Sequence, residues 1–221
     1  MEKCAASWYH SSMNRRNYRR ELDRIIERNG ETRPKVLLHS CCGPCSTSVL
    51  EDLMRHFDVT VLWYNPNLYP ESEYTLRLTT MREMLRIMGL EGKVTLLTEP
   101  WRSEEYYAAV RGLEEEPEGG KRCGECFALR MRETARRAKE LGFDYFCTTL
   151  TVSRHKNAER INAIGERIAA EEKIAWLPSD FKKRGGEDRS QQLSRELGLY
   201  QQLYCGCEFS LNKRGPKPDE E

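Results

Sequence analysis

The sequence predicts an α/β domain in which a parallel sheet of about five strands carries helices on both faces. Short apolar runs alternate with helical segments along the whole chain, a pattern typical of parallel βαβ units. The length of 221 residues is sufficient for one such domain with a full core. Seven of the nine cysteines form three tight groups, and the first group directly follows a predicted strand. The predicted fold class therefore includes a cysteine-rich metal site at the carboxyl ends of the strands.

The first four elements have clear local signals. Residues 14–28 form a basic helix that Asn29-Gly30 ends. Residues 35–40 (KVLLHS) are a short apolar run after a proline, as in a buried strand. Residues 46–56 begin with Ser and Thr, which cap helices, and residues 59–64 (VTVLWY) form a second strand stopped by Asn-Pro-Asn.

The middle of the chain continues the alternation. Residues 70–88 place apolar side chains at intervals of three and four, which predicts a long amphipathic helix with Gly89 at its end. Residues 94–99 (VTLLTE) form the third strand, and the glycine-rich residues 111–122 form a polar loop.

The last third completes the sheet. A helix built on Phe127, Met131, Ala135 and Ala138 ends near Gly142. The fourth strand is expected at 143–150, a helix at 157–172 and a short fifth strand at 174–178.

One catalytic domain is expected over residues 35–210. Residues 1–34 are predicted to be a basic helical extension, and the polar residues 211–221 a disordered tail. The net charge of +1 gives no global sign of nucleic-acid binding, although basic residues gather in 1–34 and 121–140. They indicate either phosphate contacts or solvated helix faces.

No apolar run is long enough to span a membrane, and the N-terminal residues lack the pattern of a signal peptide. The sequence therefore predicts a cytoplasmic protein with no membrane partner. Because a reducing cytosol keeps thiols free, clustered cysteines there indicate metal binding or redox chemistry.

The clusters are Cys41-Cys42-Gly-Pro-Cys45, Cys123-Gly-Glu-Cys126 and Cys205-Gly-Cys207. Ligands bind open parallel sheets beyond the carboxyl ends of the strands, where Cys41 and Cys42 are expected. Cys123 and Cys126 are expected just before a helix, whose N-terminus favours thiolates. Four converging thiolates suit either a structural zinc ion or an iron–sulfur cluster, and the spacing leaves both open.

The other cysteines allow further interpretations. Cys42-Gly-Pro-Cys45 matches the thioredoxin dithiol, although a cysteine precedes it and the other groups would then have no role. A Cys205–Cys207 disulfide would be strained and easily reduced, which favours a redox pair or two metal ligands. Cys147, within an apolar strand, is expected to be an inert core residue.

Five stretches together carry a family resemblance: LLHSCCGPCS (37–46), WYNPNLYPESEYTLR (63–77), CGECFALRM (123–131), TTLTVSRHKNAERINAIGE (148–166) and YQQLYCGCEFS (200–210). They resemble, in order, the cobalamin-independent epoxyqueuosine reductases of the QueH family. The resemblance implies a Rossmann-like fold and reduction of epoxyqueuosine to queuosine at the wobble position of tRNA, the last step of queuosine biosynthesis. It also implies an unidentified ferredoxin- or flavodoxin-like electron donor.

By motif position, the resemblance implies that Cys41, Cys42, Cys123 and Cys126 hold a [4Fe–4S] cluster. It further implies an additional mononuclear iron, to which Cys45 or a nearby side chain would bind. Cys205 and Cys207 correspond to the redox-active, catalytic pair of the family. One departure is that Gln201 stands where the family pattern leads us to expect arginine, so a charged phosphate contact is missing or supplied elsewhere.

Polar residues of the matched stretches are candidates for contacts to the base, ribose and phosphate. They are Tyr64, Asn65, Asn67, Tyr74, Arg77, Ser153, Arg154, His155 and Lys156. His39 is either another candidate or a core histidine. Arg154 and Lys156 follow a strand end and favour phosphate. The alternatives left open are a zinc-stabilised RNA-binding module and a thioredoxin-like oxidoreductase that uses Cys42 and Cys45.

Overall fold

The computed structural model describes residues 16–212 and shows five parallel strands in the order β3-β2-β1-β4-β5. The strands are β1 (Lys35–His39), β2 (Asp58–Trp63), β3 (Thr95–Thr98), β4 (Tyr145–Thr148) and β5 (Ala175–Trp176). The chain moves outward from β1 to β3 and then returns to place β4 beside β1. The strand order therefore reverses between β1 and β4, where parallel sheets form their ligand sites.

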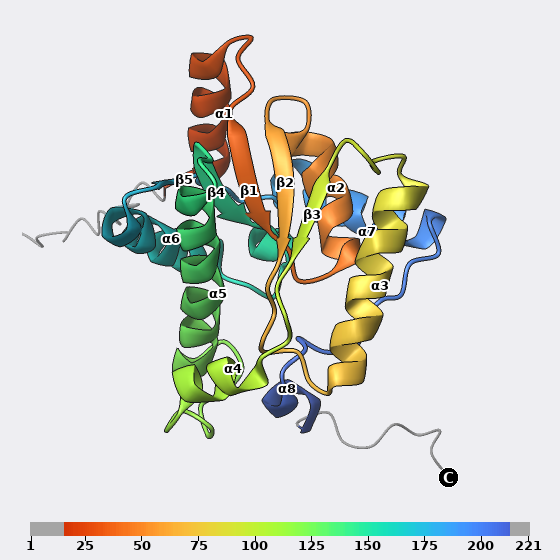
Figure 1. Ribbon diagram of the computed structural model, residues 1–221, viewed down its shortest axis with the longest axis vertical. Coiled ribbons are helices and arrows are strands. Elements are labelled where there is room, and N and C mark those ends of the chain that lie inside the picture. The colour runs from red at the N-terminus through yellow and green to blue at the C-terminus, as the bar shows by residue number, and fades with distance from the viewer. Residues whose placement is uncertain (1–15, 213–221) are drawn as a thin grey trace, which may run out of the picture.

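Helices cover both faces of the sheet, as Figure 1 shows, with α5 and α6 on one side and α2, α3 and α7 on the other. Their bounds are α1 (Tyr18–Asn29), α2 (Gly43–Leu53), α3 (Glu71–Ile87), α4 (Ser103–Val110), α5 (Lys121–Glu140), α6 (Ala158–Glu172), α7 (Gly186–Glu196) and α8 (Glu208–Asn212). Two 3-10 turns, η1 (Thr149–Val152) and η2 (Lys183–Gly185), follow β4 and precede α7. The predicted fold class is confirmed.

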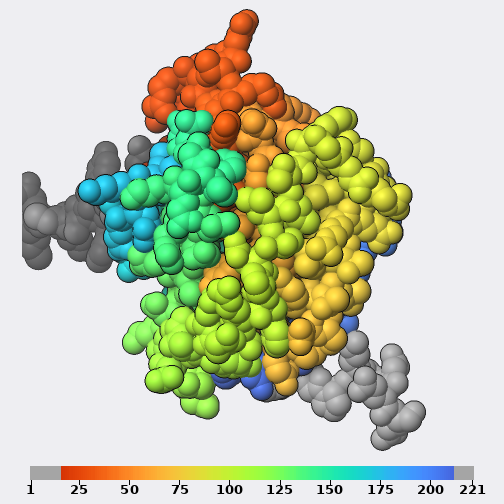
Figure 2. All heavy atoms as spheres, viewed as in Figure 1, coloured from red at the N-terminus to blue at the C-terminus, as the bar shows by residue number. Residues whose placement is uncertain are grey.

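The core explains why these segments form the elements that they do. Val36, Leu37 and Leu38 are fully buried because helices cover β1 on both faces. In the space-filling view of the same face, side chains of the surrounding helices hide most of the sheet (Figure 2). Leu22 of α1 belongs to the same core cluster, so the described part of the predicted N-terminal extension packs against the sheet domain.

Several boundaries differ from the prediction. Helix α2 begins at Gly43, because the Cys42 side chain caps it. Helix α5 begins at Lys121, so Cys123 and Cys126 lie within its first two turns rather than before it. Helix α8 ends with Leu211 and Asn212, so it includes the first two residues of the predicted tail. The rest of that tail and residues 1–15 lie outside the described residues.

Among the described helices, none combines the length and apolar character needed to cross a bilayer.

Candidate metal and redox centre

The three cysteine groups lie beyond the carboxyl ends of the strands. Cys41 follows β1 after one residue, and Cys42 caps α2 by accepting a hydrogen bond from the Cys45 N–H at 3.3 Å. Cys126 lies in the second turn of α5, and Cys207 immediately precedes α8. All eight cysteines within residues 16–212 are free thiols, so the three groups remain available for metal or redox chemistry.

The first group is compact. The sulfur atoms of Cys41, Cys42 and Cys45 all lie within 4.8 Å of one another, which makes this cluster capable of holding a metal ion. Hydrogen bonds from the Cys42 and Cys45 thiols hold the pKa of Cys41 well below its usual range. The bond to Cys41 raises the pKa of Cys45 to about 12. Cys41 is therefore the thiol of this group that loses its proton most easily, as a metal ligand must.

The second and third groups meet on the α4 and α5 side. Cys126 and Cys207 pack together against Tyr106 and Val110 of α4. Burial, together with the charges of the neighbouring cysteines, raises the pKa of Cys126 to about 12. Cys123 lies nearer the surface, where its sulfur accepts a hydrogen bond from the Gly119 N–H at 3.2 Å. Within residues 16–212, neither cysteine of α5 belongs to the compact group.

A cavity of about 470 Å³ lies between the first cysteine group and the Cys205 segment. Its wall includes Cys41, Cys45 and Cys205, and Lys156 lies among them. Burial opposes the charge of Lys156, but the surrounding thiols outweigh that effect and raise its pKa. The volume lies within the range of small-molecule sites, which is roughly 300–1,000 Å³.

Arg130 is a second cation near the thiols. Its side chain is 2 % exposed, and its one hydrogen bond within the described residues joins Nε to the Cys126 carbonyl oxygen at 3.1 Å. Burial opposes its charge, but the charges of Cys126, Cys41 and Cys205 raise its pKa. No carboxylate within residues 16–212 pairs with it, and the groups that raise its pKa are chiefly the neighbouring cysteines.

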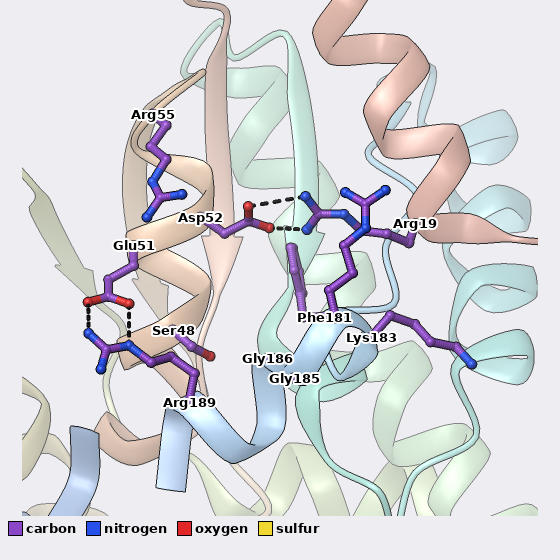
Figure 3. Close-up of a pocket in the computed structure, with 11 residues that line it drawn as sticks. Arg19, Ser48, Glu51, Asp52, Arg55, Phe181, Lys183, Gly185, Gly186 and Arg189 are labelled. Carbon is purple, nitrogen blue, oxygen red and sulfur yellow. Dashed lines mark hydrogen bonds and ion pairs between the residues drawn. The ribbon is translucent and has the colours of Figure 1, made fainter. Parts of the chain in front are cut away.

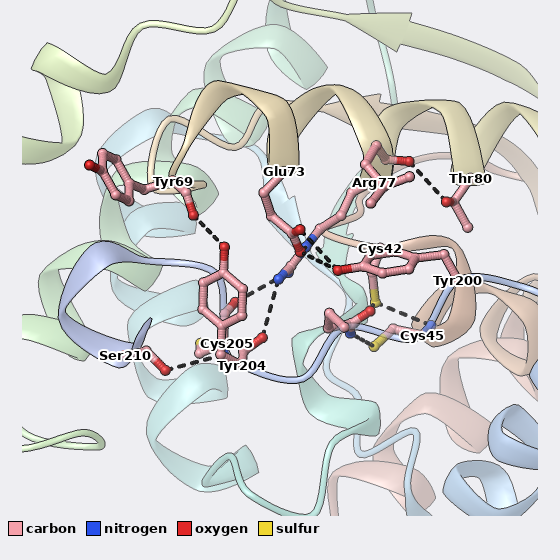
Figure 4. A network of polar contacts seen from close by, with 12 residues as sticks. Cys42, Cys45, Tyr69, Glu73, Arg77, Thr80, Tyr200, Tyr204, Cys205 and Ser210 are labelled. Atoms are coloured by element: carbon pink, nitrogen blue, oxygen red, sulfur yellow. Dashed lines mark hydrogen bonds and ion pairs between the residues drawn. The ribbon is translucent and has the colours of Figure 1, made fainter. Parts of the chain in front are cut away.

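The Cys205 segment is held in place by a buried ion pair (Figure 4). Arg77 Nε donates to Glu73 at 2.7 Å, and its Nη atoms donate to the carbonyl oxygens of Cys205 and Tyr204 at 3.3 and 3.2 Å. Tyr200 donates its hydroxyl to Glu73 at 2.9 Å. Arg77 lines the cavity, but its guanidinium is committed to this clamp.

Gln202 joins the C-terminal segment to the first cysteine group. Its Nε2 donates to Cys42 Sγ at 3.2 Å and lies 3.9 Å from Cys45 Sγ. Its Oε1 is buried and without a partner among the described residues. Gln202 also lines the cavity, so its Oε1 is a hydrogen-bond acceptor beside the sulfur atoms.

The residues after β4 divide between the cavity and its surroundings. Ser153, His155 and Lys156 line the cavity that contains the thiols. Arg154 lines a neighbouring hollow instead, and its guanidinium pairs with Glu187 at 2.7 Å. A role of these four residues in substrate binding stays a prediction.

The other candidates support the framework around the centre. Asn65 Nδ2 donates to the Ser40 carbonyl oxygen at 2.8 Å, and the Tyr74 hydroxyl donates to the Glu99 carbonyl oxygen at 2.8 Å. Tyr64 donates its hydroxyl to a carboxylate of α4 and lines a different hollow. Asn67 is 2 % exposed, and its Oδ1 has no partner within residues 16–212.

His39 is a core residue, because it is fully buried between strands. Its Nδ1 lies 2.9 Å from Thr148 Oγ1, and its Nε2 lies 3.3 Å from the Tyr64 carbonyl oxygen. Burial lowers the pKa of His39 to about 4, so its ring is neutral at pH 7. Arg130 and Gln202, by contrast, contact the cysteines and were not among the predicted site residues. Arg130 had a signal, since positions 123, 126 and 130 share one helical face.

The fold and site together define a metal-capable, thiol-rich α/β protein with its chemistry at the strand-order reversal. The family model for epoxyqueuosine reductase QueH matches residues 36–213, which are most of the chain. The chain belongs to the epoxyqueuosine reductase QueH family.

Curated relatives agree with this assignment. The epoxyqueuosine reductase QueH of Streptococcus pyogenes is 40% identical over 90% of this chain and 81% of its own length. That of Staphylococcus epidermidis is 40% identical over 90% and 86%, and that of Thermotoga maritima is 35% identical over 84% and 94%. The predicted family and its oxidoreductase class are confirmed.

Proposed function

We propose that the chain reduces epoxyqueuosine to queuosine in tRNA and that its cysteines hold a [4Fe–4S] cluster for this purpose. The family assignment supports the reaction. In this proposal Cys41, Cys42, Cys123 and Cys126 are the cluster ligands, and Cys45 binds an additional mononuclear iron. When bound, the cluster supplies single electrons, which a ferredoxin- or flavodoxin-like carrier restores.

The observation that carries the cluster proposal is the environment of Arg130. Three arginines are among the largest fully buried side chains. Arg77 pairs with a carboxylate, and Arg122 donates to three backbone carbonyl oxygens. Arg130 is the one of the three that has neither a carboxylate partner nor several carbonyl acceptors among residues 16–212, and a buried cation requires a compensating negative charge. Cysteine thiolates bound to an iron–sulfur cluster would provide that charge.

The donor atoms also fit such a group. Cysteine sulfurs that ligate metal accept hydrogen bonds from nearby N–H groups, which orient the ligands and adjust the potential. Cys42 accepts from Gln202 and from the Cys45 N–H, and Cys123 accepts from the Gly119 N–H. The sulfur atoms of Cys41, Cys42 and Cys45 lie within 4.8 Å of one another, so Cys45 is beside two of the proposed cluster ligands, as an adjacent iron requires.

Chemical balance assigns a role to the Cys205–Cys207 pair. Conversion of an epoxide to an alkene consumes two electrons and two protons and releases one water molecule. Oxidation of two thiols to a disulfide releases two electrons and two protons, so this pair matches the demand. Cys205 lines the cavity, and Lys156 beside it can donate a hydrogen bond to the departing oxygen.

The proposal includes a reducing, cytoplasmic location, because such a compartment keeps eight free cysteines reduced. The anaerobically purified protein should be brown, contain about four sulfides with four or more irons, and convert epoxyqueuosine in tRNA when dithionite is supplied. Cys123→Ser should lose iron and activity, whereas Cys147→Ser, in the core, should keep both.

Two results would count against the proposal. A colourless protein with one zinc and no sulfide after anaerobic reconstitution would favour the zinc-stabilised RNA-binding module. A metal-free protein that reduces protein disulfides through Cys42 and Cys45 would favour the thioredoxin-like interpretation.

A further inference from the structure

A second cavity, of about 330 Å³, lies between α1, α2 and the turn that leads into α7. Figure 3 shows side chains from these three elements around it. Glu51, Asp52 and Arg55 line it from α2, and Lys183 and Arg189 line it from the opposite side. None of its lining residues belongs to the cavity that contains the thiols.

The cavity carries an excess of positive charge. Both carboxylates that line it are already paired, since Glu51 binds Arg189 at 2.7 Å and Asp52 binds Arg19. Arg55 and Lys183 also line it, and neither forms an ion pair with any residue from 16 to 212. The two free cations favour an anion as the occupant.

A buried hydroxyl also faces this space. Ser48 is 8 % exposed, and its Oγ forms no hydrogen bond within the described residues. In Figure 3 it points toward Gly185 and Gly186. An unpaired buried hydroxyl is unfavourable, so a ligand that accepts its hydrogen bond would relieve the cost.

The N-terminus of α7 borders the cavity. No side chain caps this helix, and its Gly186 N–H donates to the Lys183 carbonyl oxygen. Gly185 has a φ of +75°, and a Cβ on Gly186 would lie 1.9 Å from the Phe181 carbonyl oxygen. The turn therefore requires glycine at these two positions. The acidic Glu187 in the first turn pairs with Arg154 outside this cavity.

We propose that this cavity binds a backbone phosphate of the tRNA substrate, an inference that rests on the proposed function. Helix α2 leads to it from the thiols, because Ser48 and Arg55 lie three and ten residues after Cys45 on or just beyond that helix. At 1.5 Å per residue, Arg55 is about 15 Å from Cys45 along the helix axis. At roughly 3.4 Å per nucleotide of a stacked strand, that span equals about four nucleotides.

RNA fits better than an acidic electron carrier. Arg55, Lys183 and the partnerless Ser48 hydroxyl line a concave space that has the size of a site for one small anion. A protein carrier would instead meet a broad charged surface. The site also provides a phosphate contact although Gln201 replaces the arginine expected near the Tyr-Cys-Gly-Cys motif.

The test is tRNA binding by the metal-loaded protein over a range of salt concentrations. Arg55→Ala/Lys183→Ala should bind tRNA about tenfold more weakly near physiological salt, and the slope of log K against log salt should fall by about 1. Arg82→Ala/Lys93→Ala removes one exposed arginine and one exposed lysine elsewhere and should bind as the wild type does. Ser48→Ala should bind about threefold more weakly without a lower unfolding midpoint, since its hydroxyl has no partner to lose.

The outcomes separate this site from the proposed function. Wild-type protein that does not bind tRNA at low salt would overturn the proposed substrate and the phosphate site together. Strong wild-type binding with an unchanged Arg55→Ala/Lys183→Ala variant would overturn the phosphate site alone. The RNA assignment also fails if that variant binds tRNA normally but accepts electrons from a flavodoxin-like carrier more slowly.

Discussion

Loss of the Arg77 side chain should destabilise the protein strongly, because the ion pair with Glu73 is buried. The side chains of the two residues are 2% and 9% exposed. Arg77→Met leaves the carboxylate with only the Tyr200 hydroxyl, and it leaves the carbonyl oxygens of Cys205 and Tyr204 without these donors. Removing one partner of a buried pair costs about 3–5 kcal/mol, so we expect a loss of about 4 kcal/mol in unfolding free energy.

A double-mutant cycle measured by urea unfolding tests this reasoning. Glu73→Gln/Arg77→Met contains no unpaired buried charge, so it should be about 2 kcal/mol more stable than Arg77→Met alone. The Cys205 segment should also become mobile in Arg77→Met, which should speed alkylation of Cys207, a residue 7 % exposed in the intact protein. Equal urea midpoints for Arg77→Met and the wild type would refute the clamp, and a selective loss of tRNA affinity would then favour substrate contact by Arg77.

Three further outcomes follow from single positions. Gly206→Ala should lower the free energy of unfolding by about 1–3 kcal/mol more than Gly198→Ala does. Both glycines have positive φ, but only at Gly206 would the added Cβ lie 2.4 Å from a side-chain atom. Comparison of the thermal unfolding midpoints of the two variants checks this. Gln202→Ala removes the donor to Cys42, so the reduction potential measured by anaerobic titration should shift while metal content stays constant. Cys147→Ala should destabilise by about 1–2 kcal/mol and leave iron content unchanged, since this fully buried thiol lies in the core.

The sequence was sufficient for the sheet because each strand is a short apolar run between polar segments. Helices α4 and α7 are absent from the predicted elements because they lack such an apolar pattern. Helix α7 buries one large apolar side chain, Leu193, and α4 has only eight residues. Neither presents an apolar repeat long enough to indicate a helix. Both are nevertheless important, because α4 packs on Cys126 and α7 borders the basic cavity.

The site was predictable as a set of motifs but not as a set of contacts. Cysteine spacing identified the three groups, since thiols that carry chemistry cluster along the chain. The partner of each polar residue depends on distant segments, and spacing does not reveal it. Arg77 meets Glu73 within its own helix but reaches the Cys205 carbonyl oxygen 128 residues away. Spacing therefore could not reveal that Arg77, a predicted substrate contact, also holds the backbone of the Cys205 segment.

This long-range arrangement links metal binding to folding. The proposed cluster ligands come from the ends of β1 and α5, about 80 residues apart, and these ends approach only when the sheet has assembled. Arg130 is buried by the same assembly and has no carboxylate partner within the described residues. A bound cluster would satisfy that cation and crosslink the two segments, so iron loading should raise the unfolding midpoint. Arg130→Met should reduce this gain, because the metal-loaded state then loses the cation that offsets the thiolates.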